Sequence, residues 1–236
     1  TPFGTSPTFK LLEVGEDLKR DVITAKMHGW RAGVSRKEGS LQLFYVLKEA
    51  GVKKVIAEGG VEGINPLLRP RDLILPHDFI DFTLRRDAHL FNDYLVIMRN
   101  PICSQVHGTL LEAAQSRHEG RIFERGIYAV TEGPRFESPA EVSVLGHWGA
   151  DVVGQSLAPE VYLAREIGAC YAGIYMVVNY AEGVVTPWSH QELTDIFFEE
   201  AEKIGSILVA ALQKLDVSQD TCHCHTHRKP SLLKDG

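Results

Sequence analysis

Polar side chains that can hold a heterocyclic base stand where two predicted strands give way to turns. In Thr131–Ser138, Phe136 and Glu137 come just before a predicted helix start. A phenyl face stacks on a flat ring, and a carboxylate accepts hydrogen bonds from ring N–H or amino groups. The alternative is that Glu137 only stabilises the positive end of a helix dipole. The segment therefore predicts a base clamp but does not establish it.

A second segment, Asn179–Gly183, follows the most apolar run of the chain directly. The Asn179 amide offers both a donor and an acceptor, which match a 6-oxo group and a ring nitrogen of a purine. The alternative is an asparagine that merely forms a turn.

Two further segments have features suited to binding an anion. In Gly154–Val161, Ser156 stands just before a predicted helix, and a helix N-terminus favours negative charge. In Glu58–Asn65, Gly59 and Gly60 form a predicted glycine-rich turn that would let the backbone approach a ligand closely. Ordinary helix entry and an ordinary turn are the respective alternatives.

The elements that must position these segments alternate between short apolar strands and helices, which predicts an α/β fold. A near-continuous apolar run such as Tyr171–Val178 is typical of a strand covered on both faces, so we expect a single domain with a twisted, mostly parallel central sheet flanked by helices. In such sheets ligands bind at the carboxyl ends of the strands. The predicted strands are Asp21–Lys26, Lys54–Ala57, Asp72–Leu75, Gly126–Val130, Asp151–Val153 and Tyr171–Val178, and the predicted helices are Leu41–Ala50, Pro139 to about His147, Pro159–Ile167 and a long helix after the Ser189 cap.

Composition narrows the class of protein. The 236 residues carry 25 basic and 31 acidic side chains, a net charge of −6, which disfavours a nucleic-acid binder. No apolar run is long enough to span a bilayer, so we expect no membrane partner. Four cysteines suggest no disulfide framework and favour a reducing compartment, which we take to be the cytoplasm. The opening Thr1–Gly4 is not typical of a signal peptide, and the true start of the chain can lie upstream.

The predicted domain runs over residues 1–215 and is followed by a polar C-terminal tail, residues 216–236. The tail contains the run Cys222–His227, which offers soft metal ligands. Structural zinc sites normally combine two such clusters, so we interpret this single one as incidental and predict no metal site. Cys103 and Cys170 are interpreted as ordinary buried thiols.

Together the four segments resemble the family of trimeric purine nucleoside phosphorylases and methylthioadenosine phosphorylases. The resemblance covers Thr1 to about Leu215. It is carried most specifically by the motifs at Thr1–Gly4, Phe79–Thr83, Glu132–Phe136 and Pro159–Gly168.

The resemblance implies a role for each base-site residue. Phe136 would stack on the base, while Glu137 and Asn179 match the pair that holds hypoxanthine or guanine in 6-oxopurine members. Adenine-type members carry Asp in place of Asn179 and again at the position of Ala181. Asn179 would also be catalytic, because it would stabilise the charge that grows on the purine as the glycosidic bond breaks. Gln155 would lie under the ribose, where the family has Met.

At the phosphate site the chain departs from the family pattern. Ser156, Gly59, Gly60 and Arg31 are the predicted phosphate ligands, but Met27 occupies the position of the family's phosphate-binding arginine, and Glu58 begins the segment in which the family has Thr-Asn-Ala. An arginine lost from such a site removes a bidentate donor. His28 is retained and is predicted to be catalytic.

Three functions are therefore open. The first is a phosphorylase that cleaves inosine, guanosine or 5′-methylthioinosine with phosphate as co-substrate. The second is a nucleoside hydrolase in which Glu58 or His28 assists a water. The third is a purine-binding protein without turnover. The resemblance implies no cofactor and a homotrimer or homohexamer.

Overall fold

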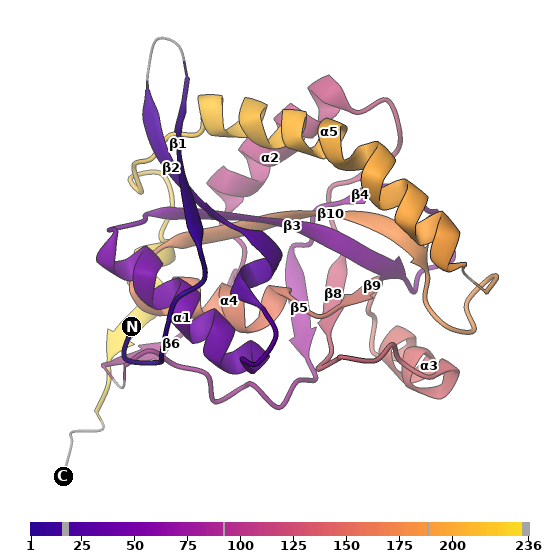
Figure 1. Ribbon diagram of the computed structural model, residues 1–236, viewed down its shortest axis with the longest axis horizontal. Coiled ribbons are helices and arrows are strands. Elements are labelled where there is room, and N and C mark those ends of the chain that lie inside the picture. The colour runs from indigo at the N-terminus through magenta and orange to yellow at the C-terminus, as the bar shows by residue number, and fades with distance from the viewer. Residues whose placement is uncertain (16–18, 92, 188, 233–236) are drawn as a thin grey trace.

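A computed structural model describes residues 1–15, 19–91, 93–187 and 189–232 of the chain. It contains a curled seven-stranded sheet in the order β5-β8-β9-β3-β10-β4-β7 (Figure 1). Four of the six strand pairs are parallel and two are antiparallel, namely β3 with β9 and β10 with β4. The predicted single α/β domain with a mostly parallel sheet is confirmed.

The centre of the sheet is the long parallel pair β3 (Lys54–Gly63) and β10 (Cys170–Tyr180). Strand β10 is buried along nearly its whole length because helices cover both of its faces. A β-bulge between Val177 and Asn179 shifts the register, so that Asn179 pairs with Glu62. Strand β9 joins β3 only at Glu62 and Gly63, and there the sheet turns away from the plane of β3 and β10 (Figure 1).

The remaining strands are short. Those of the main sheet are β4 (Leu73–Ile74), β5 (Asp78–Asp81), β7 (Ile122–Phe123), β8 (Ile127–Val130) and β9 (Val152–Gly154). Outside it, β1 (Phe9–Val14) pairs with β2 (Arg20–Ala25), and β6 (Tyr94–Val96) pairs with β11 (Arg228–Pro230).

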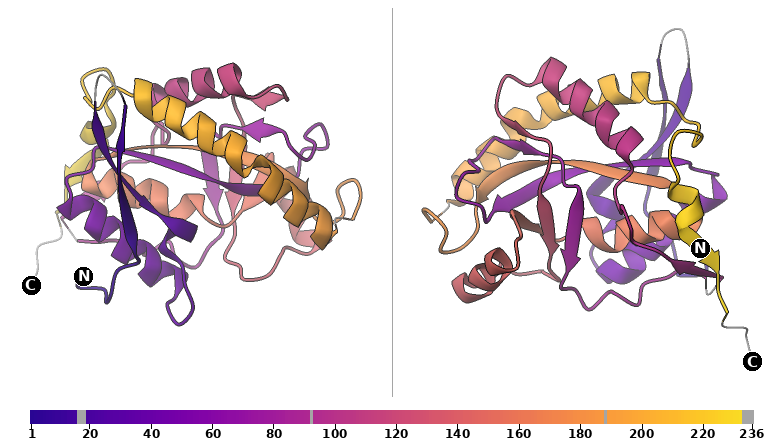
Figure 2. Two further views of the ribbon diagram at one scale, coloured as in Figure 1. Left: turned by 45° about the horizontal axis from the view of Figure 1, so that its top comes forward. Right: turned by 180° about the vertical axis from the view of Figure 1, so that it is seen from behind.

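Helices form two layers around the sheet (Figures 1 and 2). Helices α2 (Ser104–Arg117) and α5 (His190–Lys214) pack together over one face of β10, whereas α1 (Arg36–Glu49) and α4 (Leu157–Ile167) pack together on the other face. Helix α3 (Pro139–His147) lies apart at one end of the molecule. Two 3₁₀ turns, η1 (Lys26–Gly29) and η2 (Cys224–His227), complete the elements of the described residues.

The largest difference from the predicted elements lies in the glycine-rich segment. Gly59 and Gly60 were expected in a turn after a short strand, but they lie inside β3, which continues to Gly63. The paired strand β10 supplies hydrogen-bond partners along this length and outweighs the low strand propensity of glycine. The predicted strand at Asp21–Lys26 forms, as β2, but it belongs to a separate hairpin with β1.

Helix ends follow their capping residues. Ser138 and Glu141 form the expected reciprocal capping box, with Pro139 at the first helical position. Gly168 ends α4 with the left-handed φ of 77° that glycine adopts readily. Helix α1 begins at Arg36, earlier than predicted, because Ser35 caps it in a second reciprocal box with Glu38.

The C-terminal segment differs from a free polar tail. Cys222 and Cys224 are buried within the main core cluster, and β11 pairs with β6. The two cysteines alternate with the exposed His223 and His225, so the segment packs one face on the domain.

Candidate active site

A buried pair, Asn179 and Glu62, lies where β3 and β10 end. Asn179 is 3% exposed, and its Nδ2 donates to Glu62 Oε1 over 3.0 Å and to the Tyr180 carbonyl over 2.9 Å. These two acceptors fix the orientation of the amide. Asn179 Oδ1 is then buried with no hydrogen-bond partner within the described residues. A buried acceptor left open at the end of a sheet is a ready position for a ligand N–H.

Glu62 is a site residue that the sequence did not predict. Burial raises the pKa of Glu62 to about 7, and the nearby carboxylates of Glu137 and Glu182 add to the rise, whereas the hydrogen bond from Asn179 opposes it. Its Oε2 also has no hydrogen-bond partner among the described residues. Glu137 is thus close enough to Glu62 to act on it electrostatically, which places Glu137 beside the Asn179 pair.

The Thr131–Ser138 segment connects β8 to α3 and carries the predicted base clamp. Glu137 is buried, at 7% exposure, while the neighbouring Phe136 is 46% exposed. The segment is fixed by the Ser138 cap and by Gln155 Nε2, which donates to the Arg135 carbonyl over 3.2 Å. The carboxylate therefore points into the protein and the ring lies at its surface.

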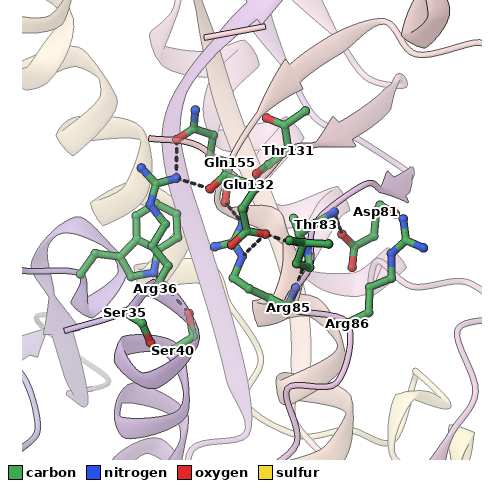
Figure 3. A network of polar contacts seen from close by, with 12 residues as sticks. Ser35, Arg36, Ser40, Asp81, Thr83, Arg85, Arg86, Thr131, Glu132 and Gln155 are labelled. Atoms are coloured by element: carbon green, nitrogen blue, oxygen red, sulfur yellow. Dashed lines mark hydrogen bonds and ion pairs between the residues drawn. The ribbon is translucent and has the colours of Figure 1, made fainter. Parts of the chain in front are cut away.

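Gln155, the predicted ribose residue, lies in a network of polar contacts (Figure 3). Its Oε1 accepts a hydrogen bond from Arg36 Nη1, which also donates to the Glu132 carbonyl over 2.8 Å. The Arg36 guanidinium lies 4.5 Å from the centroid of the Trp30 ring. Burial lowers the pKa of Arg36, and the charge of nearby Arg85 lowers it further. Two cations are thus held close together beside Gln155.

Arg85 supports the turn that carries Ser156. Its side chain is buried, and Nη2 donates to the carbonyls of Thr131 and Gln155 over 3.2 and 3.0 Å. Its Nε lies 3.5 Å from Glu132 Oε2, while Nη1 has no hydrogen-bond partner within the described part of the chain. Ser156 is itself buried, 8% exposed, before α4. A guanidinium with unused donor capacity therefore lies directly behind the predicted phosphate residue.

His28 lies in the η1 turn. Its Nδ1 is 2.8 Å from Glu160 Oε1, and Glu160 also accepts from the Tyr171 hydroxyl over 2.9 Å. Burial disfavours the charged imidazole, but the Glu160 carboxylate, helped by Glu58, raises the pKa of His28 above its ordinary value. A histidine held at Nδ1 by a carboxylate presents Nε2 in a fixed direction. A Cβ built on Gly59 would lie 3.9 Å from that Nε2, so Gly59 faces His28.

Two of the predicted phosphate ligands lie elsewhere. A Cβ built on Gly60 would meet Val178, whereas one on Gly59 faces His28, and both glycines line a cleft between the sheet and α5. Arg31 donates from Nη1 to the Gly29 carbonyl over 2.9 Å and from Nη2 to Gln42 Oε1 over 2.6 Å and to the Thr5 carbonyl. These contacts give Arg31 a role in holding the N-terminal segment.

The structure therefore gathers the predicted residues into three groups. Asn179 and Glu137 gather around Glu62, whereas His28 lies with Gly59, and Gln155 and Ser156 lie with Arg85. Arg36 and Arg85 were missed because nothing in their local sequence separates them from surface arginines. Glu62 carried a weak signal, since it is a carboxylate that directly follows the apolar Val61 near the end of a strand.

Comparison with known proteins gives the class of this fold and site. The profile of the phosphorylase superfamily matches residues 1–213, and the chain belongs to that family. It is 33% identical over 231 residues, 95% of this chain and 86% of its relative, to a probable 6-oxopurine nucleoside phosphorylase of Moorella thermoacetica. It is 36% identical over 183 residues, 76% of this chain and 63% of the relative, to a probable S-methyl-5′-thioinosine phosphorylase of Methanothermobacter thermautotrophicus.

Among solved structures, a methylthioadenosine phosphorylase from an Antarctic soil metagenomic library superposes with a TM-score of 0.78. The match covers 93% of this chain and 84% of that one at 22% sequence identity. At this identity the likeness concerns the fold. No helix in the described part of the chain is long and apolar enough to cross a membrane.

Proposed function

We propose that this protein cleaves the N-glycosidic bond of 6-oxopurine nucleosides with phosphate, giving the free base and ribose 1-phosphate. Inosine, guanosine and 5′-methylthioinosine are the candidate substrates. The observation that carries the proposal is the buried Asn179 amide, whose Nδ2 is fixed by Glu62 and whose Oδ1 is an open acceptor. The relatives named as 6-oxopurine nucleoside and S-methyl-5′-thioinosine phosphorylases support the same substrate class.

The Asn179 amide suits a departing 6-oxopurine. Its bond to the carbonyl of the adjacent Tyr180 is a local contact that Nδ2 can exchange for the purine O6, while the bond to Glu62 is kept. N7 of the bound nucleoside carries no hydrogen; as the bond between N9 and the sugar breaks, N7 takes a proton from water, and Oδ1 can then accept a hydrogen bond from N7–H of the leaving base. Negative charge grows on the purine as the bond to the sugar breaks, so contacts to O6 and N7 are stronger in the transition state than with bound substrate.

The nucleophile would bind between Ser156 and His28. In the family an arginine binds the phosphate, and Met27 occupies its position here. We propose that Arg85 and a protonated His28, whose pKa is raised, balance the phosphate charge instead. Gly59 leaves space beside the His28 ring for an oxygen of the phosphate. Gln155 would contact the ribose, with Arg36 holding its amide.

The test is release of hypoxanthine from inosine, and of guanine from guanosine, with and without inorganic phosphate. We expect release that depends on phosphate and yields ribose 1-phosphate. Release of free ribose without phosphate would instead identify a hydrolase, an outcome for which the His28–Glu160 pair offers a base. Purine binding without release in either buffer would contradict both enzymatic functions.

Replacing Glu137 with Gln is expected to weaken guanine binding by roughly ten- to a hundred-fold, the range for a charge-assisted hydrogen bond lost from a buried site. Calorimetry with guanine and hypoxanthine checks this, because hypoxanthine lacks the 2-amino group and its affinity should fall less. If guanine binds the variant as tightly as it binds the wild type, and hypoxanthine does too, Glu137 does not belong to the base site.

The proposal extends to the working form of the protein. We infer a homotrimer or homohexamer with phosphate as co-substrate and no cofactor in the reaction, as the resemblance to the family implies. The cysteine content favours a reducing compartment, which we take to be the cytoplasm.

A further inference from the structure

All four cysteines of the chain converge on one buried place, away from the candidate active site. Their Sγ atoms all lie within 4.8 Å of one another. The residues are Cys103 before α2, Cys170 at the start of β10, and Cys222 and Cys224 in the C-terminal segment, with exposures of 1, 0, 6 and 7%. Three separate parts of the chain thus contribute thiols to a single cluster.

The spacing of the sulfurs fits one tetrahedral ion. Four thiolates bound at about 2.3 Å from a Zn²⁺ lie about 3.8 Å from one another. The Cys170 and Cys222 sulfurs are 3.3 Å apart, and the remaining pairs fall within the 4.8 Å limit. We propose that Cys103, Cys170, Cys222 and Cys224 form a structural zinc site that fastens the C-terminal segment to the domain. This replaces the interpretation of Cys222–His227 as an incidental cluster.

The surroundings provide the hydrogen bonds that thiolate ligands need. Cys103 is the N-cap of α2, next to the first turn of the helix, whose N–H groups have no partner within the helix. Gln219 Nε2 donates to Cys170 Sγ over 3.4 Å. A side-chain donor thus already contacts one of the four sulfurs, and a second sulfur lies at the N-terminus of a helix.

A buried cation compensates the charge of the cluster. Binding releases the thiol protons to solvent and leaves two negative charges on a zinc ion with four thiolates. Arg165 is 2% exposed, and its guanidinium donates only to backbone carbonyls, those of Ile97, Asn100 and Pro101. Arg165 is in none of the ion pairs of the described residues, and burial lowers the pKa of Arg165 while the four nearby cysteines oppose that change. An otherwise unpaired buried guanidinium is explained by an anionic cluster beside it.

The C-terminal segment itself requires an anchor. Within residues 216–232, all of which the structure describes, Cys222 and Cys224 are the only buried side chains. Two small thiols, the short pairing of β11 with β6 and the bonds of Gln219 and Arg228 to backbone carbonyls bury little apolar surface to offset the conformational entropy lost when the segment is ordered. A metal ion supplies that free energy, as it does in small zinc domains. Because four protein ligands fill the coordination shell in a buried place, the site is structural.

The experiment measures metal in the full chain, expressed with added zinc and purified without chelator. We expect elemental analysis by mass spectrometry to find about one zinc ion per chain. Cys224→Ser should lower the content several-fold and expose the backbone amides of β11 to hydrogen exchange. His225→Ala, which removes an exposed ligand type from the same segment, should keep the zinc and the protection. Loss of zinc from both variants alike would overturn the assignment to the cysteines.

A second measurement does not depend on the variants folding. Wild-type protein stripped of metal and loaded with Co²⁺ should show the intense visible bands of a tetrahedral tetrathiolate site, and all four thiols should be alkylated after denaturation in chelator. No bound zinc and no cobalt bands, or an intact mass lowered by two hydrogens for each disulfide, would overturn the proposal. Iron in place of zinc would overturn the choice of metal. Base release is measured separately and tests the proposed function on its own.

Discussion

Replacing Asn179 with Asp is expected to lower kcat/KM for inosine by roughly 100-fold, the size of effect seen when one donor to a developing negative charge is removed. The Asp side chain has no N–H for O6, and its carboxylate repels that oxygen. A 6-amino group would instead find an acceptor, so the preference should move toward adenosine. The ratio of kcat/KM values for inosine and adenosine measures this shift.

The same substitution creates a pair of carboxylates. Asn179 Nδ2 is 3.0 Å from Glu62 Oε1, so Asp at this position would lie against Glu62, and two carboxylates so close do not both ionise. The carboxylate pair of the variant should therefore keep one shared proton at pH values above 7, where Glu62 of the wild type, with a pKa of about 7, has lost its proton. Asn179→Ala is the matched control, because it removes the amide without adding charge and should lower activity on both nucleosides. If binding of hypoxanthine relative to adenine is the same in wild type and Asn179→Asp, the residue does not read the base.

The contact between Asn179 and Glu62 also shows where prediction from sequence ends. The apolar run before Asn179 marks the end of a strand, which is a local pattern. Its partner lies 117 positions earlier, and the pairing depends on a β-bulge between Val177 and Asn179. A shift of one residue would turn a side chain to the other face of the sheet. The sequence thus gives the position of Asn179 along its strand but not the neighbour that orients it.

The arginines near the candidate site also show where prediction from sequence ends. Arg31, like Lys26, is a candidate from sequence to replace the family arginine whose position Met27 occupies. The chain between them is irregular, with left-handed φ values of 51° at Met27 and 56° at His28, so sequence distance does not predict the direction of the side chain. Arg85 follows the family motif at Phe79–Thr83, and only the turn after β5 brings it to the carbonyl of Gln155.

For the C-terminal segment, a usable pattern was present. The alternation of cysteine and histidine in Cys222–His225 has the period of two that places like residues on one face of an extended chain. In the structure His223 is not extended, with φ −110° and ψ 21°, and Cys224 begins η2, yet both cysteines are buried. Their meeting with Cys103 and Cys170 depends on the packing of β10 against α2, which local sequence does not contain.

Replacing Glu62 with Gln is expected to stabilise the protein at alkaline pH and to leave its stability at pH 4.5 nearly unchanged. The folded-state pKa of Glu62 is raised to about 7 from 4.5, so between these values the folded state binds more protons than the unfolded state. The free energy of unfolding contributed by this group is therefore fully present below pH 4.5 and is lost as the pH rises to 7. Over this window the wild type should lose up to about 3 kcal/mol relative to the variant.

Gln keeps an oxygen that accepts the hydrogen bond from Asn179 Nδ2 and carries no charge at any pH, so Glu62→Gln removes the titration while preserving the orientation of the amide. Thermal unfolding at pH 5 and pH 8.5 checks the prediction, with an expected gain of roughly 6–12 °C for the variant at the higher pH alone. Glu119→Gln is the control, since it neutralises an exposed carboxylate away from the candidate site. Parallel pH profiles for wild type and Glu62→Gln would mean that Glu62 is ionised in the folded protein throughout, and that the Asn179 amide is held by a full negative charge at neutral pH.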